Sequence, residues 1–165
     1  YISVTGVQTC ALPIWADNTS RLLDVKFQAL AGGDWFGPGA ATKEGQEVDF
    51  YHWSAILRSV SGFEIYRKVY RNVIRPEKVA ELLMLRPDMP RSLAACMNEV
   101  VANLEQVANQ QSDETLRKAG RLRADLQYGR IDEILSTGLH AFLTQFLDRV
   151  NDLRSEEHTS ELQSH

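Results

Sequence analysis

The chain has 165 residues, of which 44% are hydrophobic, 8% aromatic and 24% charged, and its formal net charge is −4. This length fits one domain with its own core, and no apolar run reaches the roughly 18 residues of a membrane-spanning helix. The mixed, slightly acidic charge argues against a dedicated nucleic-acid-binding protein, and two cysteines cannot form the disulfide framework of a secreted one.

The two ends of the chain are expected to lie outside the domain. Residues 4–14 have neither helical nor strand periodicity, and the last twelve residues are polar and equally without a pattern. Both stretches match the translation of one sequencing-library adapter oligonucleotide, read on opposite strands. We therefore predict that residues 1–14 and 154–165 are adapter-derived and contribute no packing, which leaves residues 15–153 as the domain.

The first half of the domain predicts four helices and one long loop. Apolar residues spaced by three and four predict a helix over residues 16–31. Residues 33–48 hold four glycines and one proline, which predicts a loop. The next three helices are predicted over residues 49–60, 63–73 and 76–85, the last of which begins with a proline.

The second half predicts three more helices. Two prolines interrupt residues 86–91, and Ser92 follows as the predicted N-cap of a long helix that ends near residue 111. Further helices are predicted over residues 112–128 and 131–153, with Gly129 between them. Since no alternating β pattern of useful length is present, the sequence predicts an all-α fold, a helical bundle of about six to seven helices.

The two longest predicted helices each carry an apolar stripe, and we expect these stripes to pack against each other. Both follow the spacing of three and four residues that is typical of a helix bundle. The first stripe consists of Leu93, Met97, Val100, Leu104 and Val107, and the second of Leu135, Leu139, Phe142 and Phe146.

A polar cluster on the first predicted helix is one candidate site. Asp17, Asn18, Arg21 and Asp24 lie at helical spacing, so that Arg21 can pair with Asp17 four residues earlier or with Asp24 three residues later. One interpretation is a cluster that binds a ligand or a partner group. The alternative is a network that ties helix ends together inside the bundle.

The turn before the fifth predicted helix is a second candidate. Arg86, Arg91 and Ser92 could bind an anion there, because the unpaired N–H groups and the dipole of a helix N-terminus favour negative charge. The alternative is capping, in which the Ser92 hydroxyl accepts a backbone N–H and Asp88 pairs with an arginine.

Few residues of the predicted domain have the chemistry of catalysis or metal binding. Cys96 is its single cysteine, and His52 and His140 are its two histidines. We interpret Cys96 as part of the core and His140 as a hydrogen-bonded, partly buried side chain. The sequence therefore predicts no catalytic residue, no metal site and no cofactor.

Five stretches together resemble the bacterial alpha-E family, all-helical proteins named for a Glu-Arg motif. Their order and spacing carry the resemblance, since no single stretch is a catalytic signature. The stretches are residues 16–26 (ADNTSRLLDVK), 53–61 (WSAILRSVS), 75–83 (RPEKVAELL), 86–93 (RPDMPRSL) and 128–133 (YGRIDE).

The resemblance implies a longer protein with two related helical halves, of which this chain resembles the second. Each half is expected to begin near a Glu-Arg pair, whereas Ile14 and Trp15 stand at that place here. We therefore expect a truncated half-protein. Without the other half it is expected to expose apolar surface and to aggregate or dimerise.

The resemblance also implies a function. Alpha-E proteins are similar to one another in being encoded beside, or fused to, circularly permuted ATP-grasp-type ligases and transglutaminase-like proteins. This implies a non-catalytic accessory or docking domain in peptide or amide-bond formation in the bacterial cytoplasm, with no nucleic-acid or membrane partner. The alternative is half of an enzyme, whose site lies between the two helical repeats around the missing Glu-Arg motif.

Overall fold

The computed structural model describes residues 2–31, 43–71, 73–106 and 113–163, and the side chains of residues 14–28, 50–71, 73–106 and 113–156. Within these residues the chain forms eight α-helices and no strand, which confirms the predicted all-α helical bundle. The helices are α1 (Ile2–Ala31), α2 (Lys43–Ser59), α3 (Phe63–Tyr70), α4 (Pro76–Leu85), α5 (Leu93–Gln106), α6 (Asp113–Gln127), α7 (Ile131–Thr137) and α8 (Leu139–Gln163).

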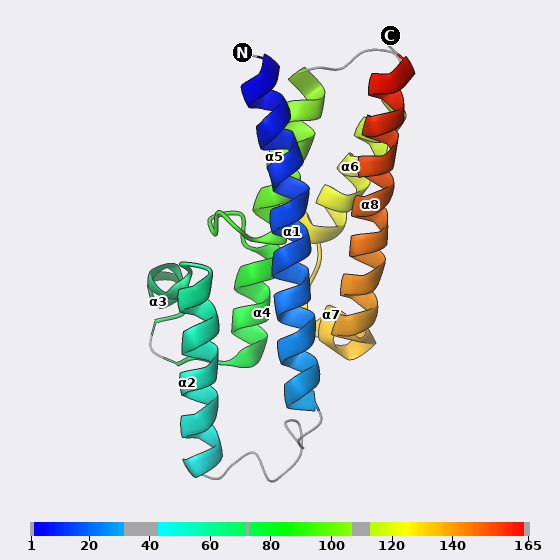
Figure 1. Cartoon of the computed structure of the whole chain (residues 1–165). Helices are drawn as coiled ribbons and strands as arrows, with labels where there is room; N and C mark the ends of the chain where they lie inside the picture. Colours follow the sequence, from blue (N-terminus) through cyan, green and yellow to red (C-terminus); the bar gives the residue numbers. More distant parts are fainter. Residues whose placement is uncertain (1, 32–42, 72, 107–112, 164–165) are drawn as a thin grey trace.

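Four of these helices, α1, α5, α6 and α8, form the main bundle (Figure 1). Helix α5 packs against α1 and α6, and α8 packs against the same two helices. Helix α4 packs against α5, α6 and α7, while α2 and α3 lie on the outer side of α4. The chain is therefore a four-helix bundle with a smaller helical layer beside it.

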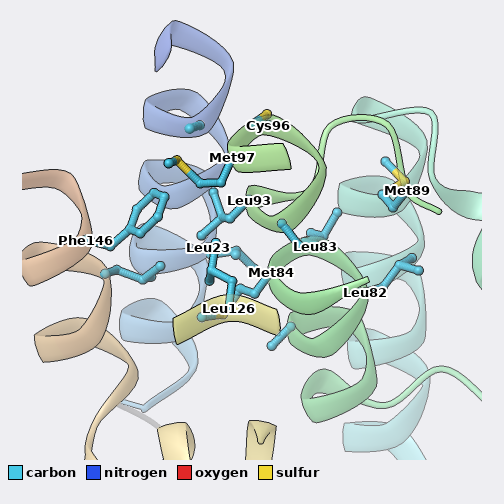
Figure 2. Packing of buried hydrophobic residues seen from close by; sticks show 14 of the residues in the cluster. Leu23, Leu82, Leu83, Met84, Met89, Leu93, Cys96, Met97, Leu126 and Phe146 are labelled. Atoms are coloured by element: carbon cyan, nitrogen blue, oxygen red, sulfur yellow. The ribbon is translucent and has the colours of Figure 1, made fainter. Parts of the chain in front are cut away.

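The centre of the bundle is filled by apolar side chains from all four main helices. Leu23 of α1, Met97 of α5, Leu126 of α6 and Phe146 of α8 are each at most 3% exposed. Figure 2 shows these side chains close together in one core. Full burial of a side chain of this size stabilises a fold by roughly 1.5–3 kcal/mol, so this core is the main source of stability.

The two apolar stripes share one core (Figure 2), but the helices that carry them are not neighbours in the bundle, contrary to the expected direct packing. The stripe on α5 is buried from Leu93 to Leu104, and Val107 lies outside the described residues. However, α5 and α8 occupy diagonal positions of the bundle, because α1 and α6 each pack against both. Helical periodicity identifies the buried face of a helix but not the helix that it faces.

The buried face of α8 is also rotated slightly from the predicted stripe. Leu139 and Phe146 are buried as predicted, whereas Phe142 is only partly buried. Leu135, the first residue of the predicted stripe, lies in α7 and is also only partly buried. Leu143, which the stripe omitted, is 1% exposed. The buried face of α8 is therefore turned away from Phe142 and toward Leu143.

The prediction of one helix over residues 131–153 is wrong because the chain turns sharply at Gly138. This glycine has a φ of +120°, a conformation that residues with a side chain rarely adopt. Its N–H donates to the Ile134 carbonyl at 3.0 Å and so ends α7. Its own carbonyl accepts the Phe142 N–H at 3.1 Å and so begins α8.

Helices α2 and α3 also differ from their predicted bounds. Helix α2 begins at Lys43, so residues 43–48 are helical where a loop was expected, and residues 33–42 lie outside the described part. The glutamates, glutamine and lysine of this stretch favour a helix enough to tolerate one glycine, which costs about 1 kcal/mol. Helix α3 ends at Tyr70 because Arg71 has a φ of +67°.

The other predicted bounds agree more closely. Helix α4 spans the predicted residues 76–85 with Pro76 in its first turn. Helix α6 ends at Gln127, two residues before Gly129. Helix α5 begins directly after Ser92 and ends at Gln106, and residues 107–111 of the predicted helix lie outside the described residues.

The backbone of both end segments is helical, although neither has helical periodicity in its sequence. Helix α1 includes residues 2–14, and α8 continues through residues 154–163. In the second segment, Glu156 accepts a hydrogen bond from Thr115 at 3.3 Å and forms an ion pair with Lys118. The adapter origin of the two segments, and the expectation that they contribute no packing, stay predictions.

Candidate functional site

The candidate polar cluster on α1 follows one edge of the helix, beside α8. Asp17, Arg21, Asp24 and Gln28 are spaced by four, three and four residues, so they form one strip along α1. Figure 1 shows α1 and α8 side by side, and the two helices pack against each other. Asn18 is exposed and lies on the adjacent, outward face.

Asp17 and Arg21 form the predicted ion pair. The Nε of Arg21 donates to Asp17 Oδ2 at 2.8 Å, and this hydrogen bond raises the pKa of Arg21. The Arg21 side chain is 68% exposed, so this pair leaves most of the guanidinium open to solvent. An exposed pair of this kind typically contributes less than about 1 kcal/mol.

Asp24 does not pair with Arg21, which was the other predicted possibility. Its Oδ1 lies 2.7 Å from Nδ1 of His140, the second residue of α8. The Gln28 amide nitrogen lies 3.4 Å from the same Oδ1 and 2.9 Å from the same Nδ1. The structure therefore separates the predicted cluster into the Asp17–Arg21 pair and a three-residue contact that joins α1 to α8.

His140 is hydrogen-bonded, as predicted, but it is not partly buried. Its side chain is 61% exposed, whereas that of Asp24 is 24% exposed. The sequence places His140 beside Leu139 and near Phe142, yet adjacent residues of a helix point in different directions. Leu139 turns toward the core and His140 turns outward along the edge of α1.

The turn between α4 and α5 brings Arg86 and Ser92 together through capping contacts. The buried Ser92 hydroxyl accepts the Ala95 N–H at 3.0 Å and donates to the Arg86 carbonyl at 2.6 Å. The Arg86 guanidinium forms an ion pair with Asp88 at 2.8 Å, which lowers the pKa of that carboxyl. These are the contacts of the capping interpretation.

Arg91, the third residue of the predicted anion site, contributes its backbone. Its side chain is exposed, while its carbonyl accepts a hydrogen bond from the buried Thr19 hydroxyl of α1 at 3.0 Å. Arg86 keeps one buried nitrogen, Nε, without a hydrogen-bond partner. The main observed role of this turn is to hold α1 against the start of α5.

A second polar cluster, at the junction of α3 and α4, was not predicted. The Tyr70 hydroxyl donates to Glu81 at 2.7 Å, and Lys78 contacts the same carboxylate at 3.4 Å. Burial is the largest cause that raises the pKa of Tyr70, and the Glu81 contact adds to it. Only the Lys78–Glu81 spacing of three residues was visible in the sequence, since Tyr70 comes from another helix.

The described residues contain neither a metal-binding cluster nor a membrane-spanning helix. Within them, no group of three or more histidine, cysteine, aspartate or glutamate side chains could hold a metal ion. None of the described helices is both long and apolar enough to cross a membrane. The polar strip of α1 with His140 is thus the candidate site that the described geometry supports best.

One protein family matches most of this chain. The model of Alpha-E, described as a predicted alpha-helical domain with a conserved ER motif, matches residues 15–159. The chain belongs to the Alpha-E family. No curated protein and no solved structure matches it. Because its 165 residues contain no Glu-Arg dipeptide, no residue of this Alpha-E chain can be assigned to that motif.

Proposed function

We propose that this Alpha-E chain is a non-catalytic accessory or docking domain. Its partner in this proposal is an ATP-grasp-type ligase or a transglutaminase-like protein that forms peptide or amide bonds in the bacterial cytoplasm. The proposal combines the partners implied by the family resemblance with the surface of α1. It also treats the chain as the second of two helical halves.

The observation that carries the proposal is the outward surface of α1. Trp15 is 44% exposed and Val25 is 60% exposed, and the Arg21 side chain between them is 68% exposed. Tryptophan and arginine, with tyrosine, are the residues enriched among those that dominate binding energy in protein interfaces. Aromatic, aliphatic and cationic groups along one helix therefore suit a protein surface as their partner.

The rigid attachment of α1 supports the same proposal. On its inner side, Ala16 and Ser20 are at most 1% exposed, and Thr19 is bonded to the Arg91 carbonyl. These small residues allow α1 to pack closely against α5. A docking helix held in this way loses little conformational freedom when a partner binds, which favours affinity.

The test is a binding titration of this chain with an ATP-grasp-type ligase encoded beside an Alpha-E relative. We expect saturable binding, and we expect Trp15→Ala and Arg21→Ala each to weaken it by about tenfold or more. The matched control is Tyr128→Ala, because Tyr128 is 78% exposed in the turn after α6, away from α1. This control should bind with unchanged affinity.

Three results would contradict the docking function. The first is an absence of binding, and the second is an equal loss of affinity in the Tyr128 control and the α1 variants. The third is product formation by a full-length Alpha-E relative without its ligase, which would instead support the enzyme that was the alternative interpretation of the sequence.

A further inference from the structure

We propose that His140 is a phosphoryl-acceptor site, modified at its Nε2 atom by the active site of another protein. The geometry that points to it is an aspartate–histidine pair formed by residues that are 116 positions apart in the chain. This inference goes beyond the docking function and does not depend on it.

The contact with Asp24 determines which ring nitrogen of His140 is nucleophilic. A carboxylate oxygen 2.7 Å from Nδ1 must share a proton with it, because two acceptors at that distance would repel each other. In the neutral ring, Nδ1 therefore carries the proton and Nε2 carries the lone pair. The Gln28 amide, 2.9 Å from the same Nδ1, does not reverse this assignment, since a hydrogen bond to a charged acceptor is the stronger one.

The exposure of His140 indicates that it enters another protein's site rather than forming one. Small-molecule active sites are concave and enclose most of their substrate. The His140 side chain is 61% exposed, and none of the described residues bonds its Nε2. A nucleophile that protrudes in this way can be reached by a phosphoryl donor held in a second protein.

The transfer balances with the groups present and an N-phosphoryl donor, the class to which phosphoramidate belongs. Nε2 attacks the phosphorus of the donor, the Nε2–P bond forms, and the bond from phosphorus to the donor's leaving group breaks with its electron pair. The product is a positively charged imidazolium whose Nδ1 proton stays between the ring and Asp24. The carboxylate thus stabilises the charge that develops, as the aspartate does in a catalytic triad.

The test uses the full chain and phosphoramidate as the small-molecule donor, from which ammonia leaves. Peptide mapping and ³¹P NMR then identify the modified residue and the modified nitrogen. We expect phosphorylation of His140 at Nε2 alone, because Nδ1 is occupied by Asp24. We expect none at His52, whose Nε2 is buried in α2.

Variants of the two residues that contact His140 test whether its modification depends on Asp24 or reflects the general reactivity of an exposed histidine. We expect Asp24→Asn to slow modification of His140 by about tenfold and to allow the Nδ1 product, because the carboxylate fixes the tautomer of the ring and stabilises the positive charge that develops on it. Gln28→Ala should leave the Nε2 product unchanged. Circular dichroism confirms that each variant is folded before its rate is compared.

The proposal is overturned if the parent chain is modified at both nitrogens of His140. It is also overturned if Asp24→Asn reacts at the parent rate with the same product, or if His140 is not modified. Since none of these measurements includes a ligase, they do not bear on the docking function.

Discussion

Two regions of this bundle are held together in opposite ways. The segment from α3 to the start of α5 is held by hydrogen bonds between residues that are close in sequence. The Tyr66 hydroxyl donates to the Val73 carbonyl, and the Ser92 hydroxyl donates to the Arg86 carbonyl. The seam between α1 and its neighbours depends on partners far away in sequence, as in Asp24–His140. In the first region, the buried hydroxyl of Ser92 finds its partners nearby in the sequence, whereas the second region has an exposed polar contact over an apolar core.

This difference suggests a division of roles: the local caps contribute to stability, whereas the exposed contact between α1 and α8 is available for function. Local caps and turns fix the course of the chain, and their removal costs stability. The exposed Asp24–His140 contact between α1 and α8 contributes little to stability, so it can be changed to test chemistry without unfolding the protein.

The apolar core under the α1–α8 seam should carry the largest effect. Phe146 is 3% exposed at the centre of the bundle, so Phe146→Ala should lower the free energy of unfolding by about 3–5 kcal/mol in a chemical denaturation. Phe142→Ala is the matched control on the same helix, and it should cost clearly less because that ring is only partly buried. Equal losses of stability in the two variants would mean that the Phe142 ring is buried as deeply as the Phe146 ring, as the stripe predicted from the sequence requires.

The buried thiol of α5 should make stability depend on alkaline pH. Burial raises the pKa of Cys96 to about 11, so the folded protein keeps the thiol neutral while the unfolded chain ionises. The stabilisation is complete below the ordinary pKa near 9 and is lost as the pH rises toward 11, at about 1.4 kcal/mol per pH unit.

The control for this pH dependence is Cys96→Ala. Burial also raises the pKa of Tyr70, so some alkaline loss should remain in the variant. The difference between the two denaturation series isolates the thiol. Parallel losses in the parent and the variant between pH 9 and 11 would contradict burial of Cys96 as the cause.

The locally satisfied region should respond most to loss of its cap. Ser92→Ala removes the hydroxyl that accepts the Ala95 N–H and donates to the Arg86 carbonyl, which should cost about 1–2 kcal/mol in thermal or chemical unfolding. Ser136→Ala is the control, because the exposed Ser136 hydroxyl bonds only the Glu133 carbonyl, and it should stay within about 0.5 kcal/mol of the parent. A neutral Ser92→Ala variant would contradict the capping role.

The exposed contact between α1 and α8 should have the smallest effect on stability. Asp24→Asn removes the charge that faces His140, whose side chain is 61% exposed, so the free energy of unfolding should change by less than about 1 kcal/mol. A calorimetric melt of the variant beside the parent measures this change. A loss above about 2 kcal/mol would show that the seam is structural and would remove the contrast between the two regions.

The sequence by itself determined the helical class and most features that act within one or two turns. The spacing of apolar residues identified the buried face of α5, Pro76 marked the start of α4, and Ser92 marked the start of α5. The Asp17–Arg21 pair was also predictable, because residues four apart on a helix are neighbours whatever surrounds them. Such features depend on local backbone geometry, which the sequence encodes directly.

Only the tertiary structure decided which helices are neighbours and which distant side chains meet. The diagonal placement of α5 and α8 follows from α1 and α6, which each pack against both of them. The choice of His140 over Arg21 as the partner of Asp24 follows from the packing of α1 on α8. Helical periodicity gives the direction of a buried face, whereas the partner of that face is selected by the packing of all the helices at once, and no short stretch of sequence carries that information.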